Sequence, residues 1–419
     1  MIVGWPACEL RVGGVKIFLV FLAAYIFSQF YRAFLAVVAV DLGRDLGFGP
    51  AELGNISAIW FITFALAQFP VGYALDHVGP RRTVAGFMVA AAIGAALFAG
   101  AHSYGTAMLA MALIGVGCSP ILMGALYVFG RTTDVARFTM LASALVGLGN
   151  IGNLASATPL AIAVSLYGWR AAMAGIAVLT ACAVMLTFVA IRDPAPVPRQ
   201  AKSTRASAFA DLLQVVRPPI LWPIFVMSAI SYAVLACERG LWIGPFLNEV
   251  FGFDAVARGN AAFAMGLAMT VGAIGLAPLA NIIGGARRTV LLCGVLTGLC
   301  FLALGLLPGR MSPEIAAALA VLLLTMIGGI GISYALLMAH GRRFYPPHLL
   351  GRGVTFQNFL FIGGASLVQS LSGRFITWSE QAGVAAPMSY GRLHLAFGLA
   401  LLAATIVYAL SRDEPPKPA

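Results

Sequence analysis

The chain has 419 residues, of which 61% are hydrophobic and only 10% are charged, and its formal net charge is +11. Ordinary soluble domains carry about 25% charged residues, so this composition excludes a soluble globular protein. Apolar runs of about 20 residues recur along the whole length, as helices that cross a hydrocarbon core ~30 Å thick require. The positive charge follows from the orientation of such helices and gives no reason to expect nucleic-acid binding.

Twelve stretches are long and apolar enough to cross a bilayer as helices. They are expected at residues 16–40, 51–75, 83–101, 104–129, 138–165, 169–191, 218–247, 258–281, 289–307, 313–339, 353–376 and 392–411. The segment before the first of them, 1–14, lacks the apolar core of a cleavable signal peptide, so we expect it to be a cytoplasmic lead-in. The predicted fold class is an all-α integral membrane protein with twelve transmembrane helices.

The basic residues predict the orientation of these helices. With both termini in the cytoplasm, the connecting segments carry roughly three times as many Lys and Arg on the cytoplasmic side as on the external side, as the positive-inside rule requires. We therefore expect a monomeric multi-pass protein of a bacterial-type inner membrane with both termini cytoplasmic. Its basic cytoplasmic rim suits contact with anionic lipid.

The longest polar interruption is residues 192–217, which contains Pro194, Pro196 and Pro198 followed by three basic residues. This composition is typical of a solvated tether between domains. It divides the chain into an N-terminal six-helix half, 1–191, and a C-terminal six-helix half, 218–419.

A tyrosine and an arginine seven residues apart occur twice, as Tyr25 with Arg32 and, 207 positions later, as Tyr232 with Arg239. Seven residues are about two helical turns, so the two side chains of each pair project from the same face of their helix. Two further landmarks recur at nearly the same offset: Gly54-Asn55 returns as Gly259-Asn260, and Arg81-Arg82-Thr83-Val84 returns as Arg287-Arg288-Thr289-Val290. Parallel repeats of six helices place a substrate site near the membrane midplane between the repeats.

The segment from Gly72 to Thr83, with the sequence Gly-Tyr-Ala-Leu-Asp-His-Val-Gly-Pro-Arg-Arg-Thr, follows the second expected span. Its glycine, three residues, aspartate, and then a glycine before paired basic residues resemble the signature loop of the major facilitator superfamily. Twelve spans in two halves joined by a basic central loop are also similar to that family's layout, so the resemblance covers nearly the whole chain. It implies transport of a small molecule by rocker-switch alternating access, with no cofactor and no enzymatic step.

The resemblance assigns a gating role to five residues of this loop: Gly72, Asp76, Gly79, Arg81 and Arg82. Asp76 is placed to accept hydrogen bonds from the N-terminus of a neighbouring helix, which carries partial positive charge, and in the family this contact latches one access state. Arg81 and Arg82 can bridge to acidic or carbonyl groups, although orientation in the membrane alone is a sufficient explanation for Arg82. The equivalent stretch of the second half lacks the carboxylate, so we expect its latch to be weaker.

Two patterns of the drug and proton antiporters in this superfamily are absent. Those proteins usually carry an arginine in the fourth helix four residues before a glycine, where this chain has Met111 before Gly115. They also carry a Gly-Pro-Gly-Gly run late in the fifth helix, where residues 147–153 read Gly-Leu-Gly-Asn-Ile-Gly-Asn. Both departures argue against a multidrug exporter.

Arg32 and Arg239 each lie inside a predicted span, where a charge costs on the order of 2.5–3.5 kcal/mol and normally faces a protein interior or a water-filled cavity. The planar guanidinium donates paired hydrogen bonds to carboxylate or phosphate. An arginine in the first helix of each half is also similar to the organophosphate and phosphate antiporters of the superfamily, which clamp a phosphate between the two. We therefore expect a small anionic substrate. The alternative is a buried ion pair with Glu238, formed by Arg239 or by Arg32 across the interface.

Six further residues complete the predicted site or its coupling. Gln29 shares the face of Tyr25 and Arg32, and Tyr232 and Trp242 share the face of Arg239. Asn150 on the fifth helix and Asn358 on the eleventh are polar groups that can face substrate or serve as packing contacts between helices. Glu238 is the one carboxylate expected inside a span and is therefore the candidate for proton coupling. An alternative function is accordingly a proton-coupled transporter or exporter of neutral or amphipathic compounds.

Other functions have weaker support from the sequence. The histidines, including His394, lie near predicted span ends or in the signature loop and have no metal-ligand spacing, and most cysteines fall inside spans, where they act as small apolar residues. Met265 and Met269 lie four residues apart and could suit copper(I), but packing is the common use of such a pair, so no metal site is predicted. A non-transporting membrane receptor of transporter ancestry is the remaining alternative.

Overall fold

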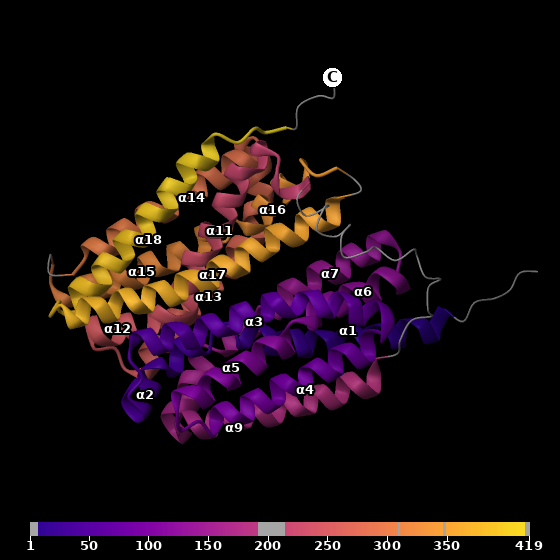
Figure 1. Cartoon of the computed structure of the whole chain (residues 1–419), viewed down its shortest axis with the longest axis horizontal. Coiled ribbons are helices and arrows are strands. Elements are labelled where there is room, and N and C mark those ends of the chain that lie inside the picture. The colour runs from indigo at the N-terminus through magenta and orange to yellow at the C-terminus, as the bar shows by residue number, and fades with distance from the viewer. Residues whose placement is uncertain (1–6, 192–213, 309–310, 347–348, 415–419) are drawn as a thin grey trace, which may run out of the picture. The chain divides into compact units, whose positions relative to one another are not determined.

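The structure, a computed structural model, describes residues 7–191, 214–308, 311–346 and 349–414. Within these residues every regular element is a helix, so the predicted all-α class is confirmed (Figure 1). The helices before the central linker are α1 (Ala7–Phe30), α2 (Leu35–Leu46), α3 (Pro50–His77), α4 (Pro80–Ala99), α5 (Tyr104–Cys118), α6 (Pro120–Thr132), α7 (Val135–Gly149), α8 (Ile151–Ala155) and α9 (Thr158–Ala190).

The helices after the central linker begin with the 3₁₀ turn η1 (Pro219–Leu221) and α11 (Trp222–Cys237). They continue with the π-helical turn η2 (Glu238–Trp242), α12 (Ile243–Phe251), α13 (Ala255–Ile283), α14 (Ala286–Leu306), α15 (Pro313–Gly331), α16 (Tyr334–Arg342), α17 (Leu350–Gln381) and α18 (Ala386–Ala409). Several predicted spans therefore consist of two or three shorter helices in series.

The number of spans agrees with the prediction. By length and composition, ten helical stretches can cross a membrane, or eleven if the interrupted pair Gly14–Phe30 and Leu35–Leu46 is one span. One of the ten, Met140–Ala190, is 51 residues long, more than twice the ~20 residues that one crossing needs. It contains two of the predicted spans, separated at Gly168, whose φ of 78° is not helical. All twelve predicted spans are thus present as helices.

Contacts divide the described residues into two compact units. Unit 1 consists of the described residues within Met1–Phe34 and Ile62–Val197. Unit 2 consists of the described residues within Leu35–Phe61 and Pro198–Ala419. The predicted linker, 192–217, lies mostly outside the described residues, so the division into halves 1–191 and 218–419 stays a prediction.

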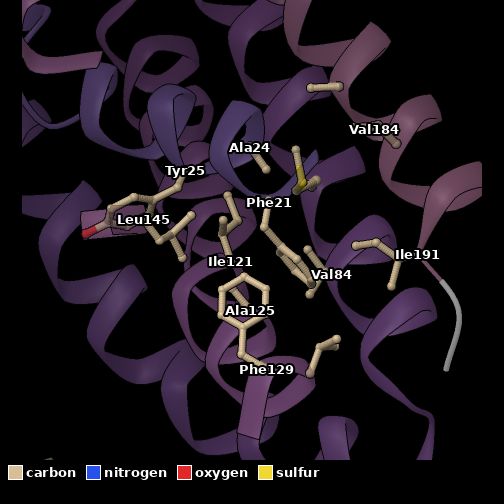
Figure 2. Packing of buried hydrophobic residues seen from close by; sticks show 13 residues of the cluster. Phe21, Ala24, Tyr25, Val84, Ile121, Ala125, Phe129, Leu145, Val184 and Ile191 are labelled. Carbon is tan, nitrogen blue, oxygen red and sulfur yellow. The ribbon is translucent and has the colours of Figure 1, made fainter. Parts of the chain in front are cut away.

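Aromatic and small residues pack the core of unit 1 (Figure 2). The rings of Phe21 on α1 and Phe129 on α6 meet edge to face, with centroids 5.9 Å apart. Small residues let the helices approach closely, because a Cβ at Gly124 of α6 would overlap the Val84 side chain of α4. Close approach through small residues is the usual basis of helix packing in membranes, where lipid offers no hydrophobic driving force.

In unit 2 the first part of α3 lies along α17 through a row of hydrogen bonds. Ser370 Oγ donates to Asn55 Oδ1 at 2.7 Å, Ser366 Oγ donates to the Ala58 carbonyl at 2.9 Å, and the Ala51 N–H donates to Thr377 Oγ1 at 3.0 Å. Between these contacts a Cβ at Gly54 would lie 2.6 Å from the Gln369 carbonyl oxygen. The glycine is therefore required for this close crossing.

The internal repeat is visible in the local backbone. Gly47, after α2, and Gly252, after α12, stand 205 positions apart and have φ of 68° and 69°. Gly79, before α4, and Gly285, before α14, stand 206 positions apart and have φ of 94° and 120°. These left-handed conformations favour glycine over residues with a side chain. Turns of the same kind thus recur at equivalent places in the sequence.

Candidate functional site

Arg32 lies at an interruption of its helix. Between α1 and α2 the chain forms a turn over residues 31–34, in which the N–H groups of Arg32 and Ala33 donate to carbonyls three residues earlier, at 3.3 and 3.1 Å. An α-helix bonds four residues back, so this turn is wound more tightly. The Tyr31 hydroxyl lies 2.8 Å from Thr180 Oγ1 and ties the turn to α9.

The Arg32 guanidinium lies among residues from two other helices of unit 1. It stands 4.9 Å from the centroid of the Phe64 ring on α3, within the range of a cation–π interaction. Cys118, the last residue of α5, interacts electrostatically with Arg32 and hydrogen-bonds with Ser28. Arg32 is only partly buried. Neither Phe64 nor Cys118 was predicted as a neighbour, because both lie on other helices and no spacing in the sequence connects them to Arg32.

Amide side chains gather one turn before Arg32. Gln29 Nε2 approaches Asn150 Oδ1 at 3.5 Å, and Asn153 Nδ2 donates to the same oxygen at 3.0 Å. Gln29 Oε1 is buried and has no hydrogen-bond partner among the described residues. The glycines flanking Asn150 make this approach possible, since a Cβ at Gly149 would overlap the Tyr25 ring and one at Gly152 would overlap the Ile26 carbonyl. Gln29 and Asn150, predicted from separate helices, thus lie together.

Arg239 lies at the equivalent place in the second copy, and there the helix is also irregular. Residues Glu238–Trp242 form a π-turn, in which the N–H of Ile243 donates to the carbonyl of Glu238, five residues back. Single π-turns inside α-helices occur frequently at functional sites. The turn at residues 31–34 and the π-turn are 207 positions apart, one wound more tightly and the other more loosely than an α-helix.

Tyr232 and Arg239, seven residues apart, lie close enough to interact. The Tyr232 ring meets those of Tyr334 and Phe361, with centroids 6.0 and 6.2 Å away. Arg239 is 7% exposed, whereas Tyr232 is half-buried. A mostly buried guanidinium beside a phenol and a cluster of rings is suited to a flat or polar small molecule that carries negative charge.

Two residues predicted nearby take different positions. Trp242 is fully buried and its indole N–H donates to Ser372 Oγ on α17 at 2.8 Å, so its polar group is already used by the protein. Asn358 on α17 is partly exposed, whereas its neighbour Gln357 is buried and donates to Ser228 Oγ and to the Leu337 carbonyl. A role in substrate binding stays a prediction for both Asn358 and Trp242.

Glu238 does not pair with an arginine. Its Oε2 lies 3.1 Å from Nε2 of His394 on α18, and both side chains are 0% exposed. The expectation that His394 lies near a span end is wrong, because α18 begins at Ala386, two turns earlier. No spacing in the sequence connects His394 with Glu238, so this contact with the predicted coupling carboxylate was not predicted.

In the signature loop, the backbone conformation of Gly79 and the contacts of Arg81 have clear structural roles. Gly79 enters α4 with φ of 94°, and Arg81 Nε donates to the Phe188 carbonyl while its guanidinium lies 4.4 Å from the Phe188 ring centroid. Arg82 and Gly72 are exposed. Asp76 is also exposed, and no hydrogen bond of its carboxylate occurs among the described residues. The latch role of Asp76 stays a prediction.

Comparison with known proteins shows the family. A profile described as Major Facilitator Superfamily matches residues 20–369. Two curated relatives are similar to parts of the chain: a probable L-galactonate transporter of Escherichia coli (strain K12), 22% identical over 59% of this chain, and the nitrate/nitrite transporter NrtP of a Picosynechococcus strain, 25% identical over 38%. The aligned regions span 57% and 35% of those proteins.

Solved structures of similar fold cover nearly the whole chain. The nucleoside transporter NupG is 15% identical with a TM-score of 0.73 and covers 95% of this chain and 99% of its own. The D-xylose-proton symporter is 13% identical with a TM-score of 0.73 and covers 95% and 98%. At these identities the likeness shows the fold alone. Together with the profile match it shows that the chain belongs to the Major Facilitator Superfamily, a family of multi-pass membrane transporters.

Proposed function

We propose that this chain is a secondary active transporter that moves a small anionic metabolite across the inner membrane. Transport proceeds by rocker-switch alternating access of the two halves, 1–191 and 218–419, with both termini in the cytoplasm. Arg32 and Arg239 bind the negative group, while Tyr25, Gln29, Asn150 and Tyr232 contribute to the surrounding surface.

The observation that supports this function best is the matched setting of the two arginines. Each occupies the same position in the repeat, each lies where its helix departs from α geometry, and each has an aromatic ring nearby, Phe64 for Arg32 and Tyr232 for Arg239. Intramembrane charges are costly and normally mark a substrate or ion pathway. An arginine retained twice at such a place favours recognition of an anion.

The names of the two curated relatives agree with this choice. One is named for L-galactonate and the other for nitrate and nitrite, all of which are anions. Because the relatives are matched over only part of their length, their substrates serve here as probes.

Thermal stability of the purified protein tests the proposal. A ligand that binds only the folded state, present at 100 times its Kd, stabilises it by about 2.7 kcal/mol. We would compare L-galactonate, nitrate, phosphate and neutral L-galactose on the wild type, on Arg32→Ala and on Arg239→Ala, with Arg82→Ala as the control because Arg82 is exposed outside the site. We expect at least one anion to stabilise the wild type and the control, and both site variants to lose that response.

The second candidate function is a proton-coupled transporter of neutral compounds, in which Glu238 carries the proton. It predicts that L-galactose or other neutral compounds stabilise the wild type, and that the response survives Arg32→Ala and Arg239→Ala but not Glu238→Gln. Retention of the stabilisation by both arginine variants would contradict the anion proposal.

A further inference from the structure

Glu238 and His394 form an isolated, fully buried ionisable pair in unit 2. The two residues are 156 positions apart in the sequence, the distance between Glu238 Oε2 and His394 Nε2 is 3.1 Å, and neither side chain is exposed. A buried charge normally needs a partner, and each residue is that partner for the other. The pair joins the π-turn η2 to α18.

The surroundings of the pair are apolar. The imidazole of His394 lies edge to face with Phe246 at 4.6 Å between centroids and also contacts the rings of Phe301 and Phe397 at 6.3 and 6.5 Å. No arginine or lysine among the described residues forms an ion pair with Glu238 within 4.0 Å, so the charge state of the pair depends on its own protons.

Further titratable groups lie on the elements that pack against the pair. Cys237 and Tyr390 interact electrostatically with Glu238, Glu249 and Glu380 interact with Tyr390, and α2 and α13 contribute Asp41 and Arg258, which interact with each other. Near the pair the neutral groups are a thiol and a phenol.

The hydrogen bond between the two side chains is compatible with two protonation states. With Glu238 ionised and His394 neutral, the Nε2–H donates to Oε2 and the pair has a net charge of −1. One added proton makes the pair neutral overall, either as a carboxylate with an imidazolium or as a carboxylic acid with a neutral imidazole. Apolar surroundings favour the form without net charge. The pair can therefore gain or lose one proton without losing its Nε2–Oε2 contact.

The atoms where such a proton would bind are identifiable. Glu238 Oε1 and His394 Nδ1 are both buried and have no hydrogen-bond partner among the described residues. These are the two basic positions that remain once Oε2 and Nε2 are joined. Buried polar atoms without partners are uncommon in folded proteins, so two of them on one ionisable pair require an explanation.

We propose that Glu238 and His394 together are the proton-binding site of the transporter, and that one proton moves in the same direction as the substrate anion. This inference rests on the proposed function for its transport step, but the proton site itself does not. Glu238 and Arg239 are consecutive residues of the π-turn, so an anion on Arg239 lies near the pair. An anion and a proton bound in this proximity stabilise each other, and by linkage protonation of the pair raises anion affinity about tenfold.

The proton site can be tested on the purified protein without a substrate. Infrared spectra as a function of pH report a proton on Glu238, and nitrogen NMR of labelled histidine reports one on His394 Nδ1. We expect one titration that is abolished in Glu238→Gln and displaced in His394→Gln, while the exposed controls Glu314→Gln and His102→Gln leave it unchanged. His394→Asn serves if His394→Gln does not fold. A titration that is absent from the wild type, or the same in Glu238→Gln, would overturn the inference.

The coupling step is tested in proteoliposomes with the anion that stabilises the protein, L-galactonate being the first probe. We expect an inwardly directed proton gradient, with the outside acidic, to drive accumulation of the anion by the wild type. We expect Glu238→Gln to lose this accumulation while it keeps the exchange of labelled for unlabelled anion. Accumulation driven by the pH gradient in Glu238→Gln would overturn the coupling role of the pair. If Arg239→Ala loses both accumulation and exchange, the defect lies in anion binding. Failure of the anion-binding proposal is therefore distinguishable from failure of the proton-coupling proposal.

Discussion

Arg81 and Arg287, which are 206 positions apart, make the same contact in the two copies of the repeat. Arg81 Nε donates to the carbonyl of Phe188 near the end of α9, and Arg287 Nη2 donates to the carbonyl of Ala409 at the end of α18, each at 2.6 Å. The C-terminus of a helix carries partial negative charge and unpaired carbonyls, which a guanidinium satisfies. In each copy an arginine at the start of one helix thus caps another.

Removing either cap should destabilise the protein without touching substrate. We expect Arg81→Ala and Arg287→Ala each to cost about 1.5–3 kcal/mol, the range for a hydrogen bond to a charged group. Thermal unfolding in detergent measures the change. Arg82→Ala is the matched control, because Arg82 is exposed and equally basic. Equal shifts for Arg81→Ala and Arg82→Ala would show that the cap contributes nothing.

Gly152 should tolerate no side chain. A Cβ there would overlap the carbonyl of Ile26, so Gly152→Ala must push α8 away from α1 and separate Asn150 from Gln29. We expect a loss of about 1–3 kcal/mol of stability, as in other overpacked cores, together with weaker binding of the stabilising anion. Gly147→Ala is the control, since nothing lies within 4 Å of its added Cβ. A Gly152→Ala protein as stable as the control would contradict the close contact.

Trp242→Phe distinguishes a packing role from a substrate role. The substitution removes the N–H that reaches Ser372 Oγ, and we expect it to cost about 1–2 kcal/mol of stability while anion affinity changes little. The control is Trp378→Phe on α17, whose side chain is 60% exposed. Unfolding temperature and anion titration are measured on each. A large loss of affinity with unchanged stability would return Trp242 to the substrate site.

The contact between α3 and α17 should open during transport. Since Ser370 Oγ lies 2.7 Å from Asn55 Oδ1, we expect Asn55→Cys with Ser370→Cys to form a disulfide under mild oxidation. Alternating access requires some helix contacts to separate in each cycle, so the disulfide should stop transport and reduction should restore it. Asn55→Cys with Leu367→Cys, where Leu367 is 60% exposed, should not cross-link. Undiminished transport by the cross-linked protein would show that this contact stays closed.

The sequence predicted what depends on local composition and period. The twelve spans could be predicted because each needs only a long apolar run. The repeat could be predicted because the loop before α4 and the loop before α14 both need a glycine with positive φ, Gly79 and Gly285. The shared face of the tyrosine and the arginine in each pair stays a prediction.

Contacts between helices could not be read from spacing. His394 meets Glu238 across 156 positions, and its span was predicted to start at Arg392, six residues after the start of α18. Arg392 is instead an exposed residue within α18, as expected of a long side chain that extends from a helix to the membrane surface. The rule that drew attention to Glu238, an ionisable residue inside a span, applies equally to His394, which lies within the predicted span 392–411.

The π-turn also determines which residues of its span face the same way. A π-turn contains one residue more than an α-turn, and each residue of an α-helix rotates the chain by about 100°. Restoring regular helix across Glu238–Trp242 by removing one residue would therefore rotate everything before the turn relative to everything after it. Tyr232 and Phe246, which now contact the Phe361 ring and His394 respectively, would no longer both meet their partners. The irregular turn thus acts as a phase adjustment between the two ends of one span.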